Sequence, residues 1–138
     1  MVRNIKYKLY YPSYKKVFRI TNIAFSKEGI IDAVAIPMKD VLPEYYGNTD
    51  CVLVLYPKDK IELLEFTGHY DIEGKEIYSG YIVSFAASNK NYIGVVEWSN
   101  QSASFLVKAK DHYGEYLNEI NEILVIGNIY ENKELLDE

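Results

Sequence analysis

The sequence predicts a mainly β protein, a β-rich α+β chain of 138 residues with one or two short helices. Two observations carry this prediction. Short segments that alternate apolar and polar residues recur every eight to twelve residues, and clusters of Gly, Asn, Ser or Pro bound them. These segments are also rich in Tyr, Val and Ile, which favour strands. Such spacing is typical of a meander followed by a small, partly open β-barrel, and an SH3-like barrel is the specific expectation.

The clearest turn and strand pattern lies in the middle of the chain. Gly68, Gly74 and Gly80 stand six residues apart, and each can take a positive φ without a Cβ penalty. The segment Asp71-Ile72-Glu73-Gly74 predicts a tight hairpin, with a type I turn and Gly74 in the left-handed position of a bulge. After Gly80 the pattern becomes a strand from Tyr81 to Phe85.

The remaining elements follow from the same reading. We expect further strands at residues 4–10, 17–25, 30–36, 51–56, 61–66, 92–98, 104–109 and 123–130. Residues 57–66 also admit a short helix, although the strand is favoured. We expect a helical turn at residues 39–42, a two-turn helix at 112–120 and a short terminal helix at 131–136. The alternation assigns a common set of side chains to the core: Tyr81, Val83, Phe85, Trp98, Phe105, Ile126 and Tyr130. For Trp98, a position capping a groove is the alternative.

Two stretches resemble the YopX family, which is found in phages and prophages of Gram-positive bacteria. The first is Thr67-Gly68 followed, after a polar turn, by Gly74-Lys75-Glu76-Ile77-Tyr78-x-Gly80-x-Ile82-Val83. The second is Val125-Ile126-Gly127-Asn128-Ile129-Tyr130-Glu131-Asn132-x-Glu134-Leu135-Leu136. The resemblance implies a single YopX-like domain over residues 1–138. Within it, the strand spacing predicts a meander at 1–50 that packs on a barrel at 51–138 as one possible arrangement. It implies a phage-encoded accessory protein and offers no activity to transfer.

The composition of the chain indicates the cellular compartment in which we expect the protein. Cys51 is the one cysteine, so no internal disulfide can form, and we expect it to be a small core residue. The N-terminus lacks an apolar signal region, and the longest apolar run, residues 51–56, is far shorter than the roughly 20 residues of a spanning helix. We therefore expect no membrane association and a cytoplasmic location, in the bacterial host if the resemblance holds.

No catalytic or metal-binding pattern is evident, so the protein is predicted not to be an enzyme. Nucleophilic catalysis needs a nucleophile beside a base, and neither His69 nor His112 lies in such a motif. The acids Asp71, Glu73 and Glu76 surround a hairpin tip, where carboxylates are normally solvated. One cysteine and two distant histidines do not match zinc spacing, and no glycine-rich phosphate loop is present. No metal and no cofactor are expected.

The fourteen tyrosines permit two interpretations. Tyrosine is common in half-buried strands, but it is also enriched at protein interfaces. The candidates for an interaction surface that binds an unknown protein partner are the tyrosines in or beside turns: Tyr10, Tyr11, Tyr14, Tyr45 and Tyr46. Residues 1–27 carry seven basic groups and no acid, whereas residues 111–138 carry eight acids and one lysine. These opposite charges either attract weakly within one chain or join two chains, and a homodimer is therefore a second expectation.

Single-stranded nucleic acid is the alternative partner. Basic side chains interleaved with aromatics are typical of grooves that bind single strands, and the N-terminal region offers five of them: Lys6, Lys8, Lys15, Lys16 and Arg19. The net charge of −5 and the pI of about 5.1 argue against this function, because an acidic protein repels phosphates. Nucleic-acid binding is therefore the less favoured prediction.

Overall fold

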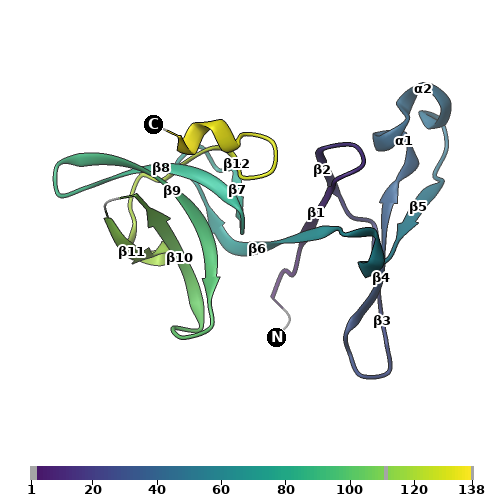
Figure 1. The fold of residues 1–138 in the computed structure, drawn as a ribbon, viewed down its shortest axis with the longest axis horizontal. Helices are drawn as coiled ribbons and strands as arrows, with labels where there is room; N and C mark the ends of the chain where they lie inside the picture. The colour runs from purple at the N-terminus through teal and green to yellow at the C-terminus, as the bar shows by residue number, and fades with distance from the viewer. Residues whose placement is uncertain (1–2, 111, 138) are drawn as a thin grey trace. The chain divides into compact units, whose positions relative to one another are not determined.

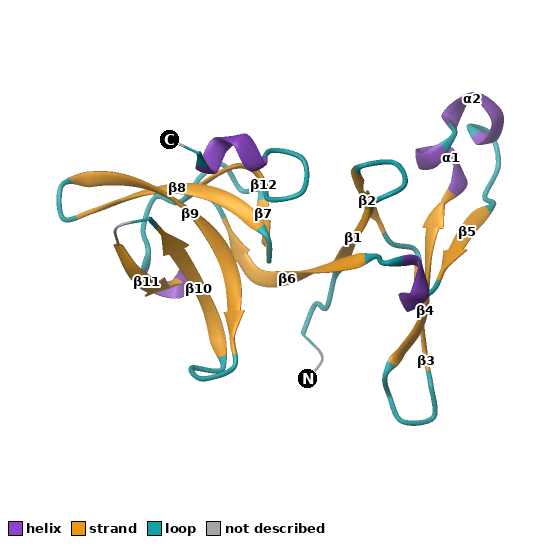
Figure 2. Ribbon diagram, in the orientation of Figure 1, coloured by secondary structure: helices purple, strands orange, loops and turns teal. Residues whose placement is uncertain are grey.

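The computed structural model of the chain describes residues 3–110 and 112–137, without the side chains of His112 and Tyr113. Strands dominate, and the helices are short (Figures 1 and 2), which confirms the predicted mainly β class. The chain forms two compact units, one of residues 7–63 and one of residues 1–6 together with 64–138. Each unit has a hydrophobic core of its own.

Residues 7–63 form a hairpin and a three-stranded meander. Its elements are β1 (Tyr7–Tyr11), β2 (Lys16–Arg19), β3 (Asn22–Phe25), β4 (Ile31–Pro37), α1 (Met38–Val41), α2 (Pro43–Tyr46), β5 (Val52–Leu55) and the 3-10 turn η1 (Pro57–Asp59). Strands β1 and β2 pair antiparallel, and β3, β4 and β5 pair antiparallel in that order. Apolar side chains from both sheets and from α1 form the core: Leu9, Phe18, Val34, Ile36, Val41 and Leu55.

Two expectations for this unit need correction. The predicted strand 17–25 is in fact two strands, because the chain leaves the hairpin at Ile20 and enters the meander. At the break, the backbone N–H and the hydroxyl of Thr21 both donate to the carbonyl oxygen of Ala35, at 2.9 and 3.1 Å. Cys51 was expected in the core but is exposed, because it precedes β5 at the end of the sheet. The predicted helical turn at 39–42 is confirmed as α1.

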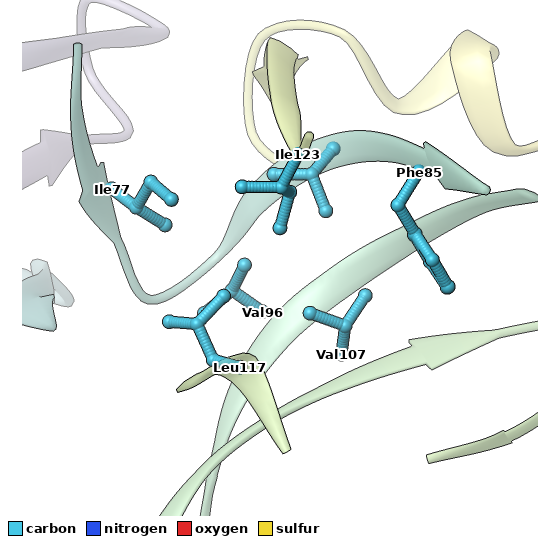
Figure 3. Packing of buried hydrophobic residues seen from close by; sticks show 7 residues of the cluster. Ile77, Phe85, Val96, Val107, Leu117 and Ile123 are labelled. Carbon is cyan, nitrogen blue, oxygen red and sulfur yellow. The ribbon is translucent and has the colours of Figure 1, made fainter. Parts of the chain in front are cut away.

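Residues 64–138 form the larger β unit. Its elements are β6 (Glu62–Tyr70, which begins in the first unit), β7 (Glu76–Tyr78), β8 (Tyr81–Ala87), β9 (Lys90–Ser99), β10 (Ser104–Ala109), β11 (His112–Tyr116), η2 (Leu117–Glu119), β12 (Leu124–Asn128) and η3 (Lys133–Leu136). Five strands pair in the order β11-β10-β9-β8-β12. The sheet curls into a partly open barrel (Figure 1). Side chains from several strands meet inside it, as Figure 3 shows: Ile77, Phe85, Val96, Val107, Leu117 and Ile123.

The hairpin predicted after Tyr70 is confirmed. The backbone N–H of Gly74 donates to the carbonyl oxygen of Asp71 at 2.9 Å, and Gly74 has φ of +81°. The strand alternative for residues 61–66 is also confirmed, since β6 covers all of them except Ile61 and only Pro57–Asp59 form a 3-10 turn. The carboxylate of Asp71 is buried, however, and is not solvated as expected.

The predicted helix at 112–120 is wrong. Residues 112–116 form β11, which pairs with β10 through Leu106 opposite Tyr116 and Val107 opposite Glu115. Pairing with a neighbouring strand outweighs the weak helical pattern, because secondary-structure propensities are small compared with tertiary packing. Trp98 also departs from expectation, since its side chain is 49% exposed and does not belong to the core.

Candidate functional site

One wall of the candidate site contains a bulge in β6. Phe66 pairs with Tyr78 and Tyr70 pairs with Glu76, so four residue steps on β6 face only two on β7. Gly68 absorbs the irregularity with φ of +85°, a conformation that side chains rarely adopt. The hydroxyl of Thr67 donates to the carbonyl oxygen of Ile77 at 2.8 Å and accepts the backbone N–H of His69 at 3.2 Å. Bulges of this kind redirect side chains, and here His69 and Tyr70 turn outward.

The second wall of the candidate site is formed by two aromatic side chains, Trp98 and Phe105. Trp98 on β9 lies directly across from Phe105 on β10, and their ring centroids are 5.0 Å apart in an edge arrangement of 70°. The indole N–H of Trp98 donates to the side-chain oxygen of Asn100 at 2.8 Å, which orients the ring. Edge contacts between rings contribute about 1 kcal/mol beyond burial. The large apolar face of Trp98 is therefore held in place while half of it stays exposed.

These walls border a cleft of about 720 Å³ within the larger unit. The N-terminal segment supplies Arg3 and Ile5, and β6 supplies Phe66 and Tyr70. The rings of Phe66 and Tyr70 are 5.7 Å apart, and Tyr70 is 52% exposed. The cleft is thus an open surface of mixed apolar and polar side chains, built from four segments distant in sequence, with Arg3 and Glu65 as charged residues of its lining.

Polar side chains make up about half of the cleft lining. The hydroxyl oxygen of Ser104 is buried and has no hydrogen-bond partner among the described residues. A buried polar atom without a partner is unfavourable by about 1–3 kcal/mol, and the burial of this oxygen keeps it out of direct contact with a ligand. His69 and Asn118 add further polar side chains to the lining.

Charges next to the cleft are neutralised within the unit. The ammonium group of Lys6 pairs with the carboxylate of Glu76 and lies 5.5 Å from the ring centroid of Phe66. The hydrogen bond to Glu76 raises the pKa of Lys6. The hydroxyl of Tyr78 donates to the same carboxylate at 3.1 Å, and burial, with help from Glu76, raises the pKa of Tyr78. Lys6, Glu76 and Tyr78 therefore form a hydrogen-bonded cluster next to Phe66, in which the charges of Lys6 and Glu76 cancel.

The tyrosines predicted as an interaction surface lie in the other unit. Tyr11 on β1 and Tyr14 in the following turn come together, with ring centroids 5.5 Å apart. Tyr45 and Tyr46 lie on α2, and Tyr45 is 77% exposed. Tyr10 is half-buried on β1. Exposure makes Tyr14 and Tyr45 the accessible members of the predicted set.

The five predicted basic residues are divided between the units. Lys6 belongs to the larger unit, whereas the other four lie on or beside β1 and β2: Lys8, Lys15, Lys16 and Arg19. Lys8 and Arg19 face each other in register, but the Arg19 guanidinium forms two hydrogen bonds to the Asp40 carboxylate at 2.7 and 3.3 Å. Those bonds hold the pKa of Asp40 below its usual value. The charge of Arg19, one of the five predicted basic residues, is therefore neutralised by Asp40.

Sequence reasoning missed the residues that line the cleft. Gly68 was flagged as a turn or bulge, and that signal was correct. Arg3 and Tyr70 carried no local signal, because only the fold brings their segments together, whereas a groove position for Trp98 was the less favoured alternative to the core. Among the described side chains, no three His, Cys, Asp or Glu groups gather where they could hold a metal ion. In the same part of the chain, no helix is long and apolar enough to span a membrane.

The fold defines a class of small β proteins in which a curled five-stranded sheet is joined to a separate hairpin and meander unit. The YopX protein family model matches residues 6–137, so this chain belongs to the YopX family, as the sequence resemblance implied.

Solved structures share this fold. Protein EF1440 from Enterococcus faecalis is 19% identical, with a TM-score of 0.63, covering 98% of this chain and 99% of its own. Protein yopX from Bacillus subtilis is also 19% identical, with a TM-score of 0.63, covering 95% of this chain and 97% of its own. No curated protein matches the chain.

Proposed function

We propose that this protein is a non-enzymatic accessory protein of a phage or prophage, which works in the host cytoplasm by binding a protein partner in the Trp98 cleft. The resemblance supports the phage setting and the location. The exposed aromatic cleft supports the mode of action. The observation that carries the proposal is the placement of Trp98, half-exposed and fixed by Phe105 and Asn100.

The composition of the cleft suits a protein ligand. Trp, Tyr and Arg are the residues that dominate binding energy at protein interfaces, and the cleft presents Trp98, Tyr70 and Arg3 together. Exposed apolar side chains of this size gain about 25 cal/mol for each Å² that a partner covers. An extended peptide segment with an apolar anchor fits these features.

Affinity capture from the lysate of a Gram-positive host tests the proposal. The tagged wild-type protein is compared with two variants, Trp98→Ala and Tyr45→Ala. Tyr45→Ala is the control, because it also removes an exposed aromatic side chain but from the other unit. We expect a partner that the wild-type protein and Tyr45→Ala retain equally and that Trp98→Ala loses by at least tenfold. Circular dichroism confirms that both variants remain folded.

Two results would contradict the proposal. If Tyr45→Ala loses the partner and Trp98→Ala keeps it, binding occurs at the tyrosine surface of the smaller unit. If no partner is recovered and a broad hydrolase screen shows turnover, the protein is an enzyme and the binding function is wrong.

A further inference from the structure

The strand β5 leaves one edge of the smaller unit open. In residues 3–110 and 112–137, β4 is its one strand neighbour, and the β4–β5 register runs without a shift from Leu55 to Val52. The run from Cys51 to Tyr56 carries no charge and no proline. An edge strand that is regular, apolar and uncharged pairs readily with another extended strand, because its outward N–H and C=O groups have no strand partner.

Three other edge strands, β2, β3 and β12, are guarded. β2 exposes Lys16 and Arg19, and the β3–β4 ladder is interrupted by a bulge at Ala24 and Phe25. The edge of β12 is occupied, because its Val125 donates to the carboxylate of Asp71. Charges, bulges and coverage are the usual devices that prevent edge pairing. Val52–Leu55 of β5 has none of them; directly after the strand, the backbone N–H of Tyr56 donates to the Asp59 carboxylate at 2.8 Å, so Tyr56 would contribute to pairing through its side chain.

The side chains of this edge are apolar on the exposed face. Val52 is 43% exposed, Val54 is 45% exposed and Tyr56, directly after the strand, is 45% exposed. Because side chains alternate along a strand, all three point to the same face, while Leu55 points into the core. A second strand laid along β5 would cover this stripe of three side chains.

Symmetry selects one register for pairing with a second copy of the chain. In an antiparallel pair centred on Val54, Val54 faces its own copy and Val52 faces Tyr56 of the second copy. A pair centred on Leu53 would instead place Tyr56 against Asp50, and one centred on Leu55 would place Val52 against Lys58. Centring on Val54 therefore matches apolar residues with apolar residues throughout.

Charges at the ends of the segment agree with this register. The same symmetry brings Asp50 to the end where Lys58 of the second copy lies. Asp50 is fully exposed, with Lys39 at 4.0 Å, and the ammonium of Lys58 lies 5.7 Å from the ring centroid of Tyr56. Opposite charges at both ends favour the antiparallel pair over a slipped one.

We propose that two copies of this protein form a symmetric dimer by antiparallel pairing of their β5 strands, centred on Val54. The pairing joins two three-stranded meanders into one continuous six-stranded sheet and buries the Val52, Val54 and Tyr56 stripe. It is a closed, two-fold contact of the kind most common among soluble oligomers. It uses the unit that does not hold the Trp98 cleft, so it stands independently of the proposed function.

Cysteine cross-linking tests the register. Cys51 is first replaced by Ser, and a single cysteine is then introduced as Val54→Cys or, for the control, as Val52→Cys. In the proposed dimer the two residues at position 54 are opposite, with Cβ atoms about 5 Å apart. Those at position 52 are offset by four residues, about 14 Å along the strand. We expect oxidation or a short bifunctional thiol reagent to link Val54→Cys at least tenfold more than Val52→Cys.

Mass measurement tests the dimer itself. Sedimentation equilibrium of the wild-type protein should approach twice the monomer mass of 16.0 kDa as concentration rises. Val54→Lys places two like charges at the symmetry axis and should return the monomer mass, whereas Tyr14→Lys, on the exposed β1–β2 turn, should leave the dimer intact.

Several results would overturn the inference. A wild-type monomer at all concentrations would show that the edge is free or takes a strand from another protein. Equal linking at positions 52 and 54 would show non-specific collision. A dimer that persists in a folded Val54→Lys variant would place the contact elsewhere.

Discussion

The carboxylate of Asp71 accepts a hydrogen bond from the backbone N–H of Val125 at 3.0 Å, across 54 residues of sequence. Its other oxygen accepts the backbone N–H groups of Glu73 and Lys75, at 2.9 and 2.8 Å. Beside it, the N–H of Ile72 donates to the carbonyl oxygen of Ile123. One side chain thus shapes the hairpin tip and fixes that tip to the edge of β12.

Replacing Asp71 should destabilise the larger unit strongly. Asp71→Ala leaves three backbone N–H groups without their acceptor, and bonds to a charged acceptor contribute about 1.5–3 kcal/mol each, although they do not add fully. We expect a loss of about 3 kcal/mol in urea unfolding followed by the fluorescence of Trp98. Glu73→Ala, at an exposed position of the same turn, is the control and should change stability by less than about 0.5 kcal/mol.

The same carboxylate predicts a dependence on pH. Burial by itself would raise the pKa of Asp71, but hydrogen bonds from Val125, Lys75 and Glu73 outweigh it and hold the pKa below the ordinary 3.8. A lowered folded-state pKa stabilises the protein above the unfolded-state pKa, and this contribution disappears as pH falls through the folded-state value. The stability difference between wild type and Asp71→Asn should therefore shrink below about pH 4. A difference that stays constant down to pH 2 would contradict this account.

Gly127 should be coupled to Asn132. A Cβ added at Gly127 would lie 2.7 Å from Oδ1 and 2.8 Å from Cβ of Asn132, whose Oδ1 accepts the backbone N–H of Asn128 at 3.1 Å. Gly127→Ala should therefore destabilise the protein by about 1–2 kcal/mol, as overpacked substitutions do. In an Asn132→Gly background the same change should destabilise it by less than half as much. Additive effects in this double-mutant cycle would show that the two residues are not coupled.

Binding to nucleic acid should be weak. Arg19 is paired with Asp40 and Lys6 with Glu76, so two cations of the predicted basic set are already neutralised. Titration with labelled single-stranded and duplex DNA and RNA should give no micromolar affinity at moderate salt. Micromolar binding that falls steeply with salt, and that disappears in a folded Lys6→Ala, Lys8→Ala, Arg19→Ala variant, would establish the alternative function.

The parts of the fold that local chemistry decides were predictable. The hairpin at residues 71–74 follows from an Asp at the first turn position and from Gly74, whose positive φ needs no distant partner. The strand from Tyr81 follows from alternation that the sheet preserves. The family motifs also have local roles, since Asn128 accepts the N–H groups of Tyr130 and Glu131 through its side chain.

The parts that depend on distant partners were not predictable. β11 exists because β10 pairs with it, and the break at Thr21 depends on the carbonyl oxygen of Ala35. Trp98 alternates as a core residue would, yet the sheet places it at the cleft. The burial of Asp71 needed Val125, which no turn rule supplies. For the same reason the cleft, assembled from four segments, could not be predicted from the sequence.

The fluorescence of Trp98, the one tryptophan of the chain, tests the central claim most directly. The purified partner, once captured, is titrated into the wild-type protein while the emission spectrum is recorded. Covering a half-exposed indole removes water from it, so we predict a blue shift that saturates at a fixed stoichiometry and matches the binding curve measured by calorimetry. Calorimetric binding with an unchanged Trp98 spectrum would contradict the account, because the partner would then bind away from the cleft.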